Sequence, residues 1–186
     1  MARRHLLFAA SAAACTIAFP ASADVVVIGS NNARMCFLAA QSNGQYHRDD
    51  LQRCDDAVVE QSGGGAALVA TYVNRGILRM RRGDMPGALA DFDVATRLDP
   101  NEPEAYLNRG SVLLRNERVS DSIVQFDAAL AKNTRRPALA HYGRGVAYEQ
   151  SGNVRAAYRD YQRAAQLAPN WDEPRRELNR FRVARN

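Results

Sequence analysis

The 186-residue sequence holds few side chains whose types and spacing could support catalysis. His141 has no Ser/His/Asp nucleophile motif around it. Asp91 and Asp93 are two residues apart, which points their carboxylates to different sides of a helix. We therefore expect no enzymatic activity, and we interpret His141 as a packed interior side chain.

Motifs for cofactors and metals are also incomplete. Residues 25–28 precede a single glycine, Gly29, where a dinucleotide-binding fold needs three, so we interpret them as an extended arm. The run at residues 62–65 lacks the Gly-Lys-Ser/Thr of a phosphate loop and is expected to be a hinge. Beyond residue 23 only His47 and His141 remain as histidines, and no CxxC occurs. We expect no cofactor and no metal site.

The N-terminus gives the cysteines a chemical context. Residues 1–23 contain Arg3 and Arg4, an apolar run and a final Ala-Ser-Ala, which is the pattern of an export signal cleaved before Asp24. This predicts a periplasmic or secreted protein. In an oxidising compartment, Cys36 and Cys54 are expected to form a disulfide rather than to remain two buried thiols.

A lipid anchor is the less favoured alternative for the N-terminus. Cys15 follows three alanines, whereas a lipoprotein motif usually has leucine three residues before the cysteine. Beyond residue 23 no stretch of about 18 apolar residues could span a membrane. Removal of two arginines with residues 1–23 leaves 23 Lys and Arg against 20 Asp and Glu, a charge of +3. These charges are mixed along the chain, so a nucleic-acid partner is not expected.

An internal repeat determines where the remaining side chains lie. Three glycines are 34 and 35 residues apart, and each is followed by an aromatic residue after sixteen positions and by an alanine after nineteen. The aligned sets are Gly76, Gly110 and Gly145; Phe92, Phe126 and Tyr161; and Ala95, Ala129 and Ala164. Apolar residues at three- and four-residue spacing predict two amphipathic helices in each unit. The expected N-caps of the second helices are Asp84, Ser120 and Asn153.

The pattern over residues 66–170 resembles the tetratricopeptide repeat, a helix-turn-helix unit of 34 residues. The resemblance implies an all-α solenoid of antiparallel helix pairs with three repeats, of an exported bacterial type. Residues 24–65 are then an N-terminal arm and a degenerate helix hairpin with a hinge, bent at Gly44, in which Cys36 and Cys54 face each other. Residues 171–186, with Trp171, form a C-terminal capping helix.

Arginines recur beside the repeat glycines. We interpret them as structural ion-pair partners of acids on the second helices, and a basic ladder for an anionic ligand is the alternative. The arginines are Arg75, Arg109 and Arg144, and the acids are Asp91, Asp127 and Asp160. A second basic set, on the expected capping helix, is interpreted as solvated, with an acidic lipid or acidic partner as the alternative. This set is Arg175, Arg176, Arg180, Arg182 and Arg185.

The resemblance also implies a concave binding groove lined by four positions of each first helix. These positions are Ala70, Val73, Ile77 and Met80; Glu104, Leu107, Ser111 and Leu114; and Leu139, Tyr142, Val146 and Glu149. The family's carboxylate clamp needs Lys and Asn where this chain has Val73 and Ile77, and basic residues in place of Leu139 and Gly143. Recognition of a C-terminal carboxylate is therefore not expected.

A largely apolar groove favours an amphipathic helix or an apolar peptide segment as ligand. We expect the partner to contact Val73, Ile77, Met80, Leu107, Ser111, Leu114, Tyr142 and Val146. The sequence thus predicts an exported scaffold or adaptor that binds another protein. The alternatives are an outer-membrane lipoprotein adaptor of the envelope machinery and a protein that binds an apolar small molecule or lipid. The chain's own N-terminal arm, or a second copy in a homodimer, could also fill the groove.

Overall fold

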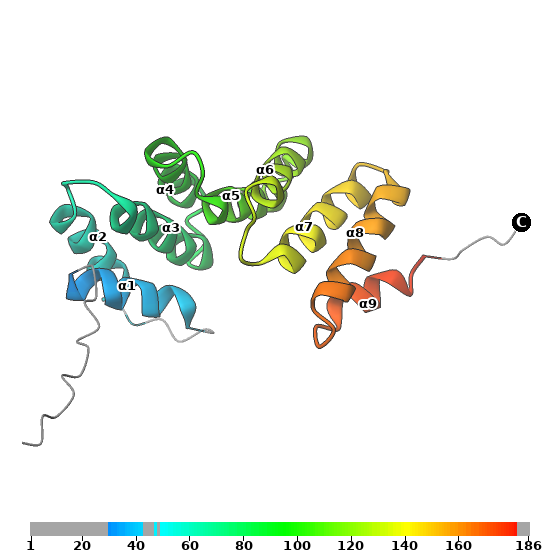
Figure 1. Ribbon diagram of the computed structural model, residues 1–186, viewed down its shortest axis with the longest axis horizontal. Helices are drawn as coiled ribbons and strands as arrows, with labels where there is room; N and C mark the ends of the chain where they lie inside the picture. The colour runs from blue at the N-terminus through cyan, green and yellow to red at the C-terminus, as the bar shows by residue number, and fades with distance from the viewer. Residues whose placement is uncertain (1–29, 43–46, 48, 182–186) are drawn as a thin grey trace, which may run out of the picture.

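All regular structure in the part of the chain that the computed structural model describes, residues 30–42, 47 and 49–181, is helical (Figure 1). The helices are α1 Asn31–Gln41, α2 Asp50–Glu60, α3 Ala66–Arg81, α4 Met85–Leu98, α5 Pro103–Arg115, α6 Val119–Ala131, α7 Pro137–Gln150, α8 Val154–Leu167 and α9 Glu173–Leu178. The expected export signal, N-terminal arm and bend at Gly44 lie outside the described residues, as do Arg182 and Arg185.

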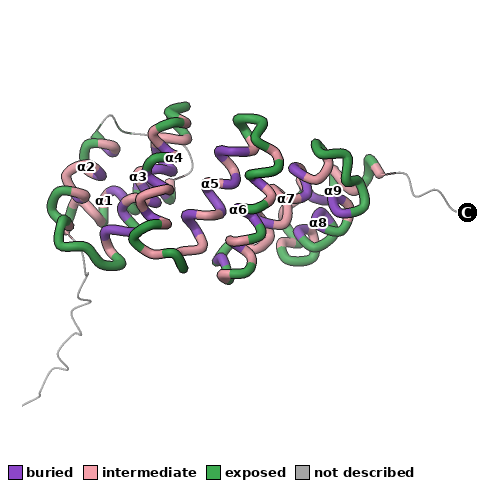
Figure 2. Tube along the Cα trace, turned by 90° about the horizontal axis from the view of Figure 1, so that it is seen from above, coloured by how far each residue is buried: buried purple, intermediate pink, exposed green. Residues whose placement is uncertain are grey.

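The helices pack as consecutive pairs in an elongated row (Figure 1). The pairs are α1 with α2, α3 with α4, α5 with α6 and α7 with α8, and α9 packs against α8. Buried positions recur within each pair, whereas the turns between helices are mostly exposed (Figure 2). The predicted all-α solenoid of helix pairs is confirmed.

Side-chain caps explain two of the three predicted starts of second helices. The Asp84 carboxylate accepts the backbone N–H of Gly87 at 2.9 Å, and the Asn153 side chain accepts that of Ala156 at 3.2 Å. These bonds satisfy donors that a helix N-terminus leaves unpaired. The prediction for Ser120 is wrong, because α6 already begins at Val119 and its N-cap residue forms no side-chain capping bond.

The core of each repeat is a glycine packed against an aromatic ring. A Cβ atom built on Gly76 would lie 2.5 Å from Phe92, and one built on Gly110 would lie 3.0 Å from Phe126. The same contact joins Gly145 to the ring of Tyr161. All three rings are almost completely buried, so the space beside them cannot accept a further side chain. The regular spacing of glycines therefore records close approach of the two helices of a unit.

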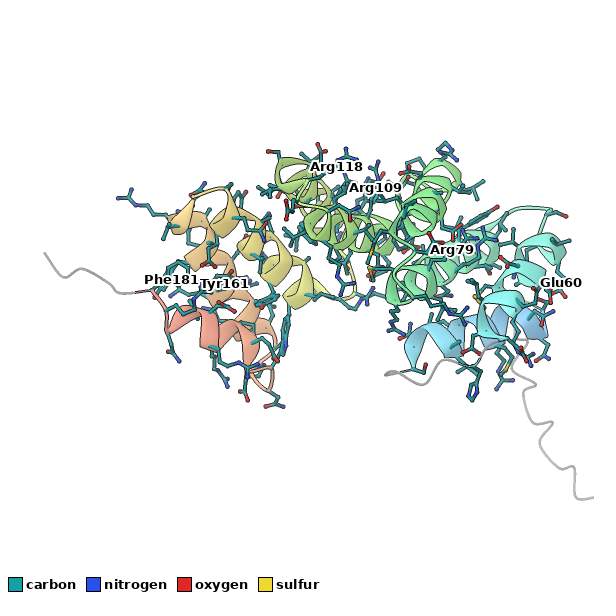
Figure 3. All side chains as sticks on the ribbon, turned by 180° about the vertical axis from the view of Figure 1, so that it is seen from behind. Glu60, Arg79, Arg109, Arg118, Tyr161 and Phe181 are labelled. Atoms are coloured by element: carbon teal, nitrogen blue, oxygen red, sulfur yellow. A yellow bond between two sulfur atoms is a disulfide. The ribbon has the colours of Figure 1, made fainter. Side chains whose placement is uncertain are left out.

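The two ends of the row are closed differently. At the N-terminal end the disulfide between Cys36 and Cys54 joins α1 to α2, as predicted, and both cysteines are buried. At the C-terminal end the ring of Phe181 packs edge-on against Tyr161, with 5.9 Å between ring centroids (Figure 3). The Trp171 ring covers Tyr142 at 4.8 Å. Helix α9, which lies between Trp171 and Phe181 in the sequence, has only six residues. It is shorter than the segment 171–186 expected to form the capping helix.

Candidate functional site

The repeated arginines are already paired inside the protein. Arg75 contacts Asp91 on α4 at 2.7 Å and Asp55 on α2 at 2.9 Å. Arg144 repeats the arrangement one unit further, with Asp160 on α8 at 2.8 Å and Asp127 on α6 at 2.6 Å. Each arginine thus connects the second helix of its own unit to that of the preceding unit.

The middle arginine has weaker partners. Arg109 donates to the Gln125 side chain at 3.1 Å, because glutamine stands where the neighbouring units have aspartate. Its Nε lies 2.8 Å from an oxygen of Asp93 but outside hydrogen-bonding geometry. The expected pairing with Asp127 is wrong, since that carboxylate binds Arg144. Arg109 lies near the middle of the solenoid (Figure 3).

Protonation states support a structural role for these arginines. Burial acts to raise the pKa of Asp160, but hydrogen bonds from Arg144 and His141 outweigh it and hold the pKa below its ordinary value. The carboxylate therefore stays charged and paired. The His141 ring lies 2.8 Å from Asp160, which confirms its interpretation as a packed side chain. The ladder of arginines is consequently not a vacant anion site.

Two described arginines on the basic side of the C-terminal segment are in direct contact with acids, and a third lies near one. Arg176 contacts Glu173 at 2.7 Å, and Arg180 contacts Glu149 at 2.8 Å. Arg175 lies 3.6 Å from Asp172. These exposed pairs contribute little stability, but they leave little net positive charge for an acidic partner.

A cavity of about 360 Å³ lies on the side of the first helices. It is formed by α1, α3, the start of α5 and the loop before α7. Its lining residues are Phe37, Gln41, Ala70, Val73, Asn74, Ile77, Glu102, Glu104, Arg135 and Arg136. The cavity thus combines an apolar part from α1 and α3 with a charged part from α5 and the loop.

The apolar part has a floor and one wall. Val73 and Ile77 form the floor, and each is only 6% exposed because it also packs in a core with Ala39 and Ala40 of α1. Phe37 forms the wall and is 49% exposed. Phe37 directly follows disulfide-bonded Cys36, so the cross-linked hairpin fixes the backbone from which this ring extends.

Asn74 contributes an amide side chain to the cavity. Asn74 is 7% exposed and lines the cavity, yet its side-chain amide forms no hydrogen bond within the described part of the chain. Asn108, 34 residues later, donates instead to the backbone carbonyl of Glu104 at 2.7 Å. The amide atoms of Asn74 are not among the fully buried polar atoms that lack a partner, and an amide that lines the cavity can both donate and accept hydrogen bonds there.

The charged part is held in place by Glu104. This 5% exposed carboxylate accepts the Thr134 hydroxyl at 2.7 Å, the Arg135 backbone N–H at 2.8 Å and the Arg136 side chain at 2.9 Å. Burial acts to raise the pKa of Glu104, but the bonds from Thr134, Arg136 and Arg135 outweigh it and lower the pKa. An ionised Glu104 therefore anchors the loop that carries both arginines.

The cavity brings together only part of the predicted groove. Val73 and Ile77 line it, as do Ala70 and Glu104 from the predicted concave positions. The assignment of Leu107 to an open groove is wrong, because its side chain is 0% exposed. It packs in a core with Phe126 and with Ala140 of α7, since the following first helix covers this side of α5.

The other predicted groove residues lie outside this cavity. Met80 and Leu114 pack against the two core clusters, and the Ser111 hydroxyl donates to the Leu107 carbonyl at 3.1 Å. Tyr142 is covered by Trp171, and Val146 is partly buried. The C-terminal half of the expected groove is thus used for packing.

The sequence prediction missed the residues that give the cavity its polarity and its wall. Asn74 could have been found, because Asn108 repeats it in the next unit. Phe37 and Gln41 come from the degenerate hairpin, and Arg135 and Arg136 come from a loop. No repeat position marks these four residues, so only the tertiary packing places them in the cavity.

Two kinds of feature are absent from the described residues. Among them, no group of three or more His, Cys, Asp or Glu side chains is arranged to hold a metal ion. No helix in this part of the chain is both long and apolar enough to cross a membrane.

Comparison with known proteins places the repeats in a family. The model of the tetratricopeptide repeat matches residues 73–132 and 107–171, which together cover more than half of the chain. A curated relative, the Protein CTR9 homolog of Arabidopsis thaliana, is 28% identical over 101 residues, which are 54% of this chain but only 9% of that protein. The chain therefore spans a small fraction of that relative's length.

Solved structures show the same fold. The first TPR of Spaghetti (RPAP3) bound to the HSP90 peptide SRMEEVD has a TM-score of 0.59 and 24% identity, covering 62% of this chain and 91% of that one. YrrB, described as a TPR protein with an unusual peptide-binding site, has a TM-score of 0.60 and 24% identity, covering 67% and 62%. MamA of Desulfovibrio magneticus has a TM-score of 0.62 and 21% identity, covering 80% and 82%. The repeat model and the shared solenoid show that this chain belongs to the tetratricopeptide repeat family.

Proposed function

We propose that this chain is an interaction scaffold that binds an extended segment of a partner protein in the cavity between α1, α3 and α5. The observation that carries the proposal is the cavity, in which the Asn74 side chain, with no hydrogen bond to a described residue, lines the same space as the apolar Val73 and Ile77. An amide group both donates and accepts hydrogen bonds, so it matches the N–H and C=O groups of a peptide backbone.

The size and composition of the cavity agree with this ligand. Its volume of about 360 Å³ lies in the range of about 300–1,000 Å³ that is typical of ligand sites. An extended segment could place one apolar side chain on the floor and its backbone beside Asn74. Two solved structures with this fold are described as peptide-bound or peptide-binding, which supports the same class of ligand for this chain.

We also propose that the scaffold works outside the cytoplasm. The support is the pattern of residues 1–23 together with a buried disulfide, a bond that is rare in reducing compartments. Mass spectrometry of the protein from its natural host should find Asp24 as the first residue. A lipidated Cys15 as the first residue would favour the anchored alternative, and an intact Met1 would contradict export.

The binding proposal can be tested with peptides. A random 12-residue phage library is selected on the disulfide-bonded protein, and the affinities of the selected peptides are measured by fluorescence anisotropy. Asn74→Ala should weaken binding by about tenfold or more, because losing a buried hydrogen bond costs about 1–3 kcal/mol. Failure to select any peptide would contradict the proposal, and so would equal affinity for Asn74→Ala.

A matched control separates loss of contact from loss of fold. Asn116 is an exposed asparagine at the C-cap of α5 and does not line the cavity. Asn116→Ala should bind the selected peptides like the wild type. Circular dichroism of both variants should show unchanged helix content.

A further inference from the structure

We infer that the cavity selects segments in which an apolar side chain lies close to a carboxylate side chain, and that Arg135 binds the carboxylate. The inference rests on the proposed function and specifies its ligand. Neither Arg135 nor the half-exposed Phe37 stands on a first-helix position of the three repeats, so this specificity is a property of this chain's loop and hairpin.

The four charged lining residues are not equally available. Glu104 is buried and accepts three donors, and Glu102 accepts the Glu104 backbone N–H at 3.1 Å. Arg136 is paired with Glu104 at 2.8 Å. Two acids and two arginines line the cavity. Three of them, Glu102, Glu104 and Arg136, already form hydrogen bonds or an ion pair within the protein.

Arg135 is the charge that remains accessible. Its side chain is 79% exposed, and the nearest carboxylate oxygens, of Glu102 and Glu104, lie at 3.7 and 3.9 Å. A direct bond between a guanidinium and a carboxylate is about 2.7–2.9 Å long. The guanidinium carries five N–H donors, so it has the capacity to bind a ligand carboxylate through two parallel bonds.

The position of Arg135 is fixed although its side chain is exposed. Its backbone N–H donates to Glu104 at 2.8 Å, and the neighbouring Thr134 hydroxyl donates to the same oxygen at 2.7 Å. These bonds hold the loop against α5. A ligand carboxylate would therefore meet a guanidinium whose backbone is already ordered, which lowers the entropy cost of binding.

The apolar half of the ligand is indicated by Phe37. This ring is 49% exposed and lines the cavity together with Val73 and Ile77. Covering it with an apolar side chain removes apolar surface from water, which favours binding. An anion without an apolar group would leave the ring exposed, and a basic segment would offer no acceptor to the Arg135 guanidinium. One segment with both groups satisfies both halves of the cavity.

Parallel selections test the charge preference. The same random 12-residue phage library is selected on the full disulfide-bonded protein, on Arg135→Glu and on Arg159→Glu, an exposed arginine of α8 that does not line the cavity. Peptides from the wild type and from Arg159→Glu should be enriched in Asp and Glu near an apolar residue. Peptides from Arg135→Glu should lose this enrichment and favour Lys and Arg. Enrichment that is absent, or unchanged in Arg135→Glu, overturns the inference.

A double-mutant comparison then assigns the contact. In a selected peptide, replacing the carboxylate by its amide should weaken binding to the wild type about tenfold and to Arg135→Gln less than twofold. Equal losses on both proteins overturn the inference, while peptide binding itself would still support the proposed function. Absence of any selected peptide contradicts both. Binding that is gained only when residues 24–29 are deleted also overturns the inference, because the chain's own segment would then be the occupant.

Discussion

Gly143 provides a direct test of the packing between the second and third repeats. A Cβ atom built on it would lie 2.6 Å from the Cζ atom of Phe126, whereas carbon atoms pack at about 3.5–4.0 Å. The ring must therefore move by about 1 Å to accept an alanine. It has little room to move, because it is 1% exposed and its edge also lies against Gly110.

We expect Gly143→Ala to lower the free energy of unfolding. Overpacking typically costs about 1–3 kcal/mol, and replacing glycine by alanine inside a helix returns about 1 kcal/mol. The net loss should be up to about 2 kcal/mol, measured by urea denaturation followed by circular dichroism. A variant more stable than the wild type would refute the reasoning.

Two further proteins assign the effect to the ring. In a Phe126→Leu background the loss caused by Gly143→Ala should disappear, because the shorter side chain leaves space; the difference is the coupling energy of the pair. Gly63→Ala is the matched control, since a Cβ atom there meets nothing within 4 Å. It should leave the stability unchanged or raise it slightly.

Three further predictions concern ion pairs, acid and the disulfide. Arg144→Ala should destabilise the protein by about 2–3 kcal/mol, somewhat less than the loss of a whole buried ion pair, because the buried Asp160 carboxylate keeps the His141 ring as a partner. Arg109→Ala should cost about 1 kcal/mol because its main partner is a neutral amide. Equal shifts in thermal denaturation would contradict this. The pKa of Glu104 is lowered in the folded chain, so its contribution to stability is complete above the ordinary value of about 4.3 and is lost as the pH falls through the folded value. Glu104→Gln should therefore lose less stability than the wild type in urea titrations from about pH 5 to pH 3, and parallel losses would be evidence against the anchoring role. Reduction of the bond between Cys36 and Cys54 should lower the free energy of unfolding by about 3 kcal/mol, and an unchanged urea midpoint in dithiothreitol would show that the hairpin does not need it.

The helix pairs could be predicted from the sequence because their determinants are local and periodic. The spacing from Gly76 to Phe92 recurs in each unit, and the two residues meet within one helix pair. The disulfide could be predicted because Cys36 and Cys54 hold facing positions on one expected helix hairpin. Asp91 was identified as the partner of Arg75 for the same reason, since both belong to one repeat.

The cavity could be predicted only in part. A repeat position determines the direction in which a side chain points, but it does not determine which neighbouring helix packs over that side chain. Val73 and Leu107 hold the same repeat position, yet only Val73 lines the cavity. The difference arises from what packs next to each, which is α1 in one case and α7 in the other. The place of Arg135 depends on the bonds that Glu104 makes to a loop about 30 residues away in the sequence, and no periodic pattern records such a contact.

The repeated arginines give the solenoid a direction. Each unit supplies an acid to the arginine of the unit that follows it, and the three acids are Asp55, Asp93 and Asp127 on α2, α4 and α6. The degenerate hairpin thus supplies an acid, Asp55, to the arginine of the first repeat, although the hairpin has no arginine at the corresponding position. In the third unit the aligned position is Gln162, which offers no carboxylate onward. The arginine of a fourth repeat grafted after α8 would therefore lack an acid from the preceding unit, because Gln162 is neutral. Duplication of an internal repeat preserves these ion pairs, whereas addition of a repeat after α8 does not.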